Sequence, residues 1–308
     1  MYAVANQPFG NLIVSATILA VSACVVAWLW AAVQWWQRRP ILPYQPRRPV
    51  PWHAIDLAII VVFYLVMQSG VIALADACLG SAASRAPAIY DASGSQAEHI
   101  VAQLIAEGNP WVFLLCIVSA GLVEPISEEL FFRVLLQGWL QALQHRWRRQ
   151  MPTLRRLIPG GLGPIMLTSL LFARLHFRVD TPPIDLRFLL FLLAGDAGAR
   201  LLTSAFAVAW LRWHVGATAA DLGWTAKNTP GDVRLGLLSF MAVAAPVYAV
   251  QIAFRYLLPA CIAPDPLPLF FFALALGALY YRTHRLLPSI VLHAALNGTS
   301  LVLAWLGG

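Results

Sequence analysis

The sequence predicts an all-α membrane protein, a polytopic bundle of about eight transmembrane helices. Three observations lead to this prediction: 60% of the 308 residues are hydrophobic, only 11% are charged, and the mean hydropathy is +0.70. Soluble domains contain about 25% charged residues. Apolar segments of roughly 20 residues recur along the chain, and each is long enough to cross the ~30 Å hydrocarbon core of a bilayer as a helix.

The first of these segments follows an N-terminus without basic residues, and its apolar run is too long for a signal peptide, so we expect it to be retained. The third segment contains Pro125, which predicts a kink or a break into two pieces. The fourth and seventh segments are short. The eight predicted helices are about 12–36, 54–78, 111–143, 163–178, 187–212, 233–257, 267–281 and 287–306.

This pattern divides the chain into three regions. Residues 1–80 form an N-terminal membrane region of two helices, and residues 111–308 hold the remaining six. Between them, residues 81–110 form a loop outside the membrane, in which "AEHIVAQLIAEG" has the spacing of a short interfacial helix.

The basic residues indicate how the chain is oriented. Loops after the first, third, fifth and seventh helices are rich in arginine, whereas the opposite loops hold few basic residues. By the positive-inside rule, the arginine-rich loops are cytoplasmic and both termini lie on the other side. The net charge of +7 therefore reflects topology and attraction to anionic lipid rather than nucleic-acid binding. Lys227 is the single lysine, a bias that indicates a GC-rich genome and a bacterial inner (plasma) membrane.

Ionisable side chains occur inside the predicted helices, where each costs about 2.5–3.5 kcal/mol on insertion scales. Such residues are candidates for function, and many of them are four positions apart, on one face of a helix. We expect the clusters to converge on one buried, hydrated cavity. They are Glu124, Glu128, Glu129 and Arg133 in "VEPISEELFFRVLL", Arg174 with His176, Asp196 with Arg200, and His293 with Asn297.

The alternative for each cluster is a structural role. A carboxylate and an arginine four residues apart are more often a structural ion pair, which is the interpretation we favour for Asp196 with Arg200. A single membrane histidine more often forms a hydrogen bond between helices than binds a ligand. Three polar clusters on three helices are harder to explain in this way, and they favour a functional site.

Three ordered motifs connect the chain to a known family. "EELFFR" fits Glu-Glu-x-x-x-Arg, "FARLH" fits Phe-x-x-x-His, and "HAALN" fits His-x-x-x-Asn. Over roughly residues 111–178 and 267–300 the chain resembles the CAAX-processing and bacteriocin-processing (CPBP, or ABI) family of intramembrane proteases. The resemblance implies a protease core within 111–308 and a two-helix insertion at about 185–260. Two residues depart from the family pattern: Val134 replaces a frequent glycine, and Arg174 adds a charge to the second motif.

The resemblance also implies roles for these residues. Glu128 and His176 would hold and deprotonate a water molecule, while His293 and Asn297 would face the oxyanion of the tetrahedral intermediate. Burial and a neighbouring carboxylate both disfavour the charged form of Glu128, as suits a general base at neutral pH.

Two supporting roles complete this prediction. Arg133 would pair with Glu129 and keep that second carboxylate ionised, and Phe172 would form a wall of the cavity.

Alternatives to this mechanism remain open. Glu128, His176 and His293 could bind Zn²⁺ with water as the fourth ligand, leaving Glu129 as the base. We favour the metal-free mechanism, because the sequence has no HExxH spacing that would preform a zinc site. The expected partners are the lipid bilayer and a membrane-associated or CAAX-like peptide, which in the eukaryotic members is prenylated. A catalytically inactive binding or immunity protein and a proton-coupled transporter are the other two hypotheses.

Overall fold

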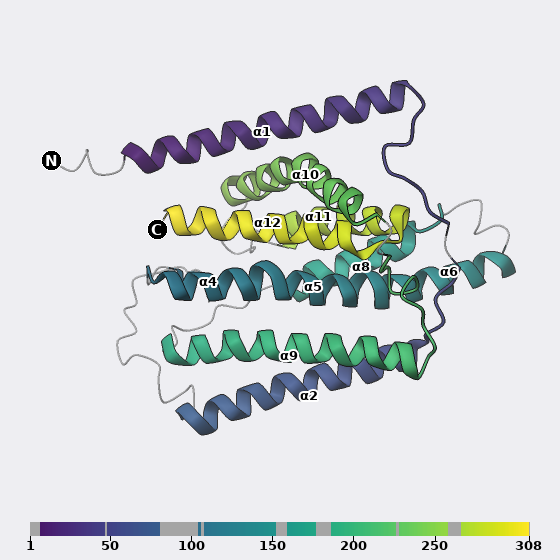
Figure 1. Ribbon diagram of the computed structural model, residues 1–308. Helices are drawn as coiled ribbons and strands as arrows, with labels where there is room; N and C mark the ends of the chain where they lie inside the picture. Colours follow the sequence, from purple (N-terminus) through teal and green to yellow (C-terminus); the bar gives the residue numbers. More distant parts are fainter. Residues whose placement is uncertain are drawn as a thin grey trace. The chain divides into compact units, whose positions relative to one another are not determined.

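The computed structural model describes residues 7–46, 48–80, 104–105, 108–151, 159–176, 186–225, 228–257 and 266–307. Within these ranges all regular secondary structure is helical, which confirms the predicted all-α class (Figure 1). The helices are α1 (Gln7–Trp36), α2 (Ala54–Leu79), α4 (Pro110–Val118), η2 (Ser119–Val123), α5 (Glu124–Glu129), η3 (Leu130–Gln137), α6 (Gly138–Gln150), α8 (Leu162–Leu175), α9 (Leu186–Trp213), α10 (Thr229–Leu257), α11 (Pro266–Thr283) and α12 (Leu286–Gly307).

Six helical segments of the described chain are long and apolar enough to cross a membrane. They are α1, α2, the run from α4 to α6, α9, α10 and α12. The shorter apolar helix α8 and the 18-residue α11 bring the total to the predicted eight. Many large side chains exposed on α1 and α2, such as Leu19, Val26 and Val66, are apolar. Exposed apolar surface of this extent suits contact with lipid, and the chain is an integral, multi-pass membrane protein.

The third predicted segment is helical from Pro110 to Gln150, and π-helical stretches on both sides of α5 accommodate its irregularity. Glu124 donates its backbone N–H to the Ser119 carbonyl, five residues back. In the same register the Ala120 carbonyl would need an N–H from residue 125, which is proline and has none. The helix thus passes through Pro125 by widening into a π turn, a feature that is frequent at functional sites.

The chain forms two compact units, which we call unit 1 (Met1–His53, Glu128–Arg178 and Val215–Leu296) and unit 2 (Ala54–Ser127, Val179–His214 and Asn297–Gly308). In unit 1, α8 packs on α11, α10 packs on both α1 and α11, and η3 contacts α8 and α11. The core of this unit includes Phe132, Phe172, Phe272, Leu276 and Leu292. Close packing of this kind holds membrane helices together, because lipid is as apolar as the side chains themselves.

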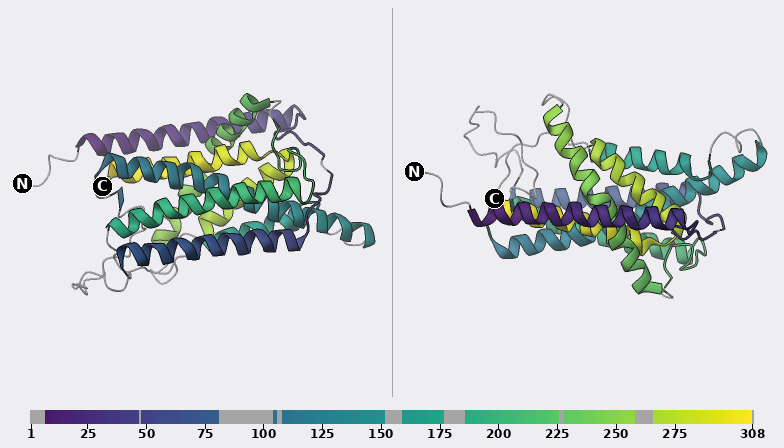
Figure 2. Two further views of the ribbon diagram at one scale, coloured as in Figure 1. Left: turned by 60° about the horizontal axis from the view of Figure 1, so that its bottom comes forward. Right: turned by 90° about the horizontal axis from the view of Figure 1, so that it is seen from above.

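In unit 2, α2 lies beside α9, as two views show (Figure 1 and Figure 2). The Phe63 and Phe206 rings stack 4.1 Å apart, and Trp210 donates its indole N–H to Asp56 at 3.0 Å. Most of the predicted extramembrane segment 81–110 lies outside the described residues, and its interfacial helix stays a prediction. Leu104 and Ile105, from that segment, are buried in the core of unit 2.

Candidate active site

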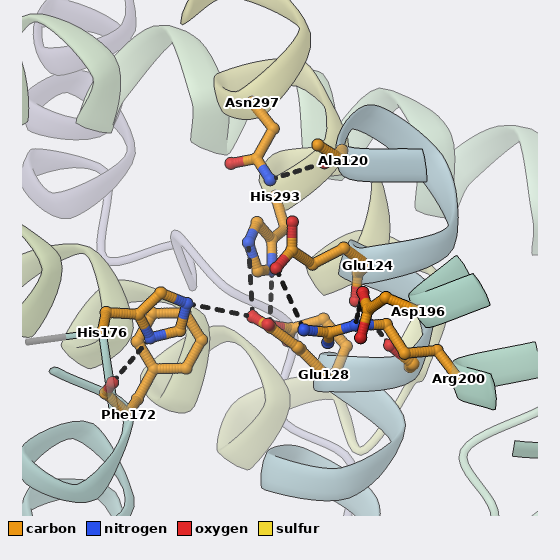
Figure 3. Close-up of polar contacts among 11 residues, drawn as sticks. Ala120, Glu124, Glu128, Phe172, His176, Asp196, Arg200, His293 and Asn297 are labelled. Atoms are coloured by element: carbon orange, nitrogen blue, oxygen red, sulfur yellow. Dashed lines mark hydrogen bonds and ion pairs between the residues drawn. The ribbon is translucent and has the colours of Figure 1, made fainter. Parts of the chain in front are cut away.

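Unit 1 brings together six of the seven predicted site residues. Glu128 and Glu129 end α5, and Arg133 follows them in η3. Two further side chains come from other helices: His176 ends α8, and His293 lies in α12 (Figure 3). The sixth residue is Phe172, in α8.

Glu129 is the centre of a buried polar network. Its side chain and that of Arg133 are fully buried, and Arg133 donates Nε–H to Glu129 Oε2 at 3.3 Å. The other carboxylate oxygen, Oε1, lies 3.0 Å from His293 Nδ1. Since a carboxylate paired with arginine can only accept, the proton of this bond belongs to His293 Nδ1. The predicted pair of Arg133 and Glu129 is therefore present, and it also fixes the tautomer of neutral His293.

The network continues to two residues that the sequence reasoning missed. Gln137 approaches Arg133 Nη1 with its Oε1 at 3.4 Å and donates Nε2–H to the Gly277 carbonyl of α11 at 2.9 Å. Gln137 could have been found from its position four residues after Arg133, continuing the spacing from Glu129. A π turn holds more residues than the 3.6 of an α turn, so side chains four residues apart in η3 project more nearly from one face of the helix than they would in an α-helix. No motif or residue spacing in the sequence indicated a contact at Gly277.

The tautomer of His176 is also fixed with the proton on Nδ1, in this case by a backbone carbonyl. Its Nδ1 lies 2.7 Å from the Phe172 carbonyl, which can only accept, so Nδ1 carries the proton. The backbone of His176 has φ −91° and ψ 3°, in a sparsely populated region where many active-site residues occur. Its ring stacks on Phe172 at 4.3 Å, and the Phe272 ring meets His293 edge-on at 5.2 Å. Both aromatic rings contact a histidine of the candidate site, and the role of Phe172 as a cavity wall stays a prediction.

With both Nδ1 atoms bonded to other acceptors, each histidine ring directs its Nε2 atom toward one carboxylate oxygen. Glu128 Oε2 lies 3.5 Å from His176 Nε2 and 4.0 Å from His293 Nε2 (Figure 3). The Glu128 side chain is 9% exposed and that of His176 is 22% exposed, so the opening lies on the His176 side. Three electron-pair donors that face one another require a proton, a water molecule or a cation among them.

These three residues fit a zinc ion by the chemistry of their donor atoms. Ligands of a tetrahedral zinc with bonds of about 2.0–2.1 Å lie about 3.3 Å apart. The 3.5 Å between Glu128 and His176 is close to this separation, whereas the 4.0 Å between Glu128 and His293 is longer. Each histidine also donates its other N–H to a carboxylate or a backbone carbonyl, as zinc-bound histidines usually do.

Asn297 belongs to unit 2, where its amide donates to the Ala120 carbonyl at 2.8 Å, the carbonyl that Pro125 leaves without a helical donor. Its predicted part in the reaction stays a prediction. Arg174 is exposed near the end of α8.

A second ion-pair network occupies unit 2. Arg200 bonds Asp196 at 2.7 Å and Glu124 at 3.2 Å, and Gln68 of α2 donates to Asp196. The network joins α2, α9 and Glu124 and agrees with the structural role favoured for Asp196 and Arg200.

Comparison with known proteins places the chain in a family. Residues 110–299 match the family model described as type II CAAX prenyl endopeptidase Rce1-like. The match includes all three sequence motifs, and it covers more than half of the chain. Neither the curated proteins nor the solved structures contain a match to the chain. The chain belongs to the type II CAAX prenyl endopeptidase Rce1-like family, a family of intramembrane peptidases.

Proposed function

We propose that this protein is an intramembrane endopeptidase in which Glu128 deprotonates a water molecule that attacks the peptide carbonyl. The observation that carries the proposal is the convergence of His176 Nε2 and His293 Nε2 on Glu128 Oε2, with both Nδ1 protons held by other acceptors. A water molecule at this point donates one hydrogen to Glu128 and the other to His176, and it keeps a lone pair for the attack.

The proton balance follows from this arrangement. As the C–O bond forms, the proton of the water passes to Glu128, and the carbonyl oxygen becomes an oxyanion. When the C–N bond breaks, Glu128 returns the proton to the leaving amine, and the carboxylate is regenerated. Burial of Glu128 favours this role, because water that would stabilise its charge is largely excluded.

His293 takes the oxyanion role in this mechanism. A neutral His293 has its proton on Nδ1, so Nε2 can donate to an oxyanion only when the ring is an imidazolium. Glu129 stabilises that cation directly, as the carboxylate of a catalytic triad does for its histidine, and Arg133 keeps Glu129 ionised.

Zinc is the second candidate, and the donor set described above favours it as well. Glu128, His176 and His293 would hold the ion, which supplies an activated water and polarises the carbonyl when bound. His293 would then remain neutral, in contrast to the metal-free mechanism. Treatment of the purified protein with a strong chelator separates the two. Retained hydrolysis supports the metal-free mechanism, and a loss that Zn²⁺ reverses supports zinc.

For the substrate, we propose a membrane-associated peptide with a prenylated C-terminal segment. The family description names prenyl endopeptidases that act on CAAX sequences. The candidate site lies on apolar helices, and a prenyl chain would hold a substrate in the same bilayer. We also propose that this bilayer is a bacterial inner membrane, from the arginine bias of the sequence.

The test compares a farnesylated CAAX peptide with the same peptide lacking the lipid, with products identified by mass spectrometry. Faster cleavage of the farnesylated peptide supports the substrate, and equal cleavage rejects the lipid requirement. An inactive binding protein would bind the peptide without cleaving it. A proton-coupled transporter would show a gradient-driven flux in liposomes and no hydrolysis.

A further inference from the structure

Unit 1 contains a cleft of about 600 Å³ lined mainly by polar and aromatic side chains, apart from the candidate catalytic residues. It lies where α6 and α11 end and α8 begins, and Tyr44, Arg48, Pro49 and Val50 also line it. Arg48, Arg148 and Arg149 line it together with Tyr44, Tyr281 and Gln141, and no carboxylate occurs among its described lining residues. We call it the arginine cleft.

The part of the lining beside Arg148 has a fixed geometry. Gly161 donates its N–H to Gln144 Oε1 at 2.8 Å and has φ +81°, a conformation that favours glycine. A Cβ at Gly161 would lie 2.3 Å from the Tyr281 ring, so only glycine allows the ring to pack there. The Tyr281 and Tyr44 rings lie 6.4 Å apart, and the Arg282 guanidinium covers Tyr44 at 5.3 Å.

The charges at the arginine cleft are strongly unbalanced. Arg48 forms two hydrogen bonds to Asp221, at 2.8 and 3.2 Å, and that carboxylate also accepts from Thr218. Arg148 is half-buried and Arg149 is exposed. The negative end of the α6 dipole lies near these two residues and carries about half an elementary charge. Among its described lining residues the cleft holds three arginines and no carboxylate, a composition that favours an anionic ligand.

A buried hydrogen-bond donor points to the same kind of ligand. Gln141 Nε2 is buried and makes no hydrogen bond within the part of the chain that the structure describes. Buried polar atoms are nearly always satisfied, and because Gln141 lines the cleft, we infer that a ligand oxygen there accepts from this donor. Arginine recognises phosphate in particular, because its planar fork donates two parallel hydrogen bonds.

We propose that the arginine cleft binds a phosphate group, carried by an anionic lipid headgroup or by a soluble molecule. The ends of α6 and α11 line the cleft together with residues that follow α1, and the positive-inside rule predicts that these parts lie on the cytoplasmic side. Basic pockets between helices on that side suit anionic headgroups. The site does not depend on the proposed reaction, and it uses none of the candidate catalytic residues.

The test uses the full-length protein in nanodiscs that contain phosphatidylglycerol and phosphatidylcholine, with the lipids retained on the protein counted by native mass spectrometry. We expect preferential retention of phosphatidylglycerol, weakened about fivefold by Arg148→Gln and by Arg149→Gln. Arg146→Gln is the matched control, because Arg146 is exposed on the same helix and does not line the cleft. Arg149 is exposed, so Arg149→Gln should leave the fold unchanged. If Arg148→Gln destabilises the protein, Arg149→Gln therefore still tests the cleft.

A second arm adds inorganic phosphate to lipid-free protein in detergent and measures the unfolding temperature. Stabilisation by phosphate that is lost in Arg148→Gln identifies a site for soluble phosphate. Retention of phosphatidylglycerol without an effect of inorganic phosphate identifies a headgroup site. The proposal is overturned if neither ligand distinguishes wild type from the Arg148 and Arg149 variants, or if Arg146→Gln weakens retention equally.

Discussion

His293 donates its Nδ1–H to Glu129 Oε1 at 3.0 Å, and this contact distinguishes the roles of the two adjacent glutamates. Glu129 is fully buried, accepts from Arg133 as well, and holds a histidine in place. Glu128, the next residue along the chain, faces the Nε2 atoms of both histidines and lies beside the partly exposed His176. We infer that Glu129 positions the site and that Glu128 performs the chemistry.

Loss of Arg133 should destabilise the protein rather than only inactivate it. Arg133→Ala leaves Glu129 as an uncompensated charge in a fully buried position, and breaking a buried pair commonly costs about 3–5 kcal/mol. We expect lower expression and a lower unfolding temperature together with lost activity. The double variant Glu129→Gln with Arg133→Gln should recover stability without recovering activity, because His293 no longer faces a carboxylate. A stable Arg133→Ala protein would show that the ion pair does not support the fold.

A side chain at Gly277 should destabilise the protein, because α11 approaches the polar network closely there. A Cβ at this position would lie 3.0 Å from Ile165 Cγ2 and 3.3 Å from Arg133 Nη1. Gly277→Ala should cost about 1–3 kcal/mol, as overpacked cores do, and should also lower turnover. Gly70→Ala in α2 is the control, because its Cβ would meet nothing within 4 Å. Equal unfolding temperatures for the two variants would contradict this view of the packing.

Asp221 should make stability depend on pH in the acid range. Burial raises the pKa of Asp221, but hydrogen bonds from Arg48 and Thr218 outweigh burial and lower it from 3.8 to about 2. Because the folded-state pKa lies below the unfolded value, the carboxylate stabilises the fold above pH 3.8, and this contribution disappears as the pH falls through about 2. Asp221→Asn should therefore cost about 1.5–3 kcal/mol near neutral pH and progressively less below 3.8.

The measurement is the difference in unfolding temperature between wild type and Asp221→Asn at several pH values. Arg48→Gln should reproduce part of the difference near neutral pH, since it removes the same ion pair. A difference that stays constant down to pH 2 would show that Asp221 does not titrate as a bonded carboxylate.

The arginine-rich loops should face the cytoplasm, with both termini on the other side. In a chain without native cysteines, Arg146→Cys should react with a membrane-impermeant maleimide only after the cells are permeabilised. Cys78 is the positive control, because it is exposed at the end of α2, on the predicted outer side. A chain that keeps Cys78 alone should be labelled in intact cells. Labelling of the 146 position in intact cells would reverse the predicted topology.

The sequence was sufficient for the helices and for most of the candidate site. Hydrophobic length predicts the spans, and spacing by four residues predicts the pair of Glu129 and Arg133. The π turns beside α5 could not be predicted, because a proline reveals a missing donor but not how the helix adapts to it. Contacts between distant segments, such as Gln137 with Gly277 or the arginine cleft, depend on how helices pack and leave no local signal.

The turnover of Glu128→Gln tests the account most directly. The amide preserves the volume of the side chain but cannot take a proton from water, so hydrolysis of the farnesylated peptide should fall by about 10²–10⁴-fold. The unfolding temperature should stay close to that of wild type, because a neutral amide costs less to bury than a carboxylate. Full hydrolysis by Glu128→Gln, or unfolding as severe as that of Arg133→Ala, would show that Glu128 is a structural carboxylate and not the base.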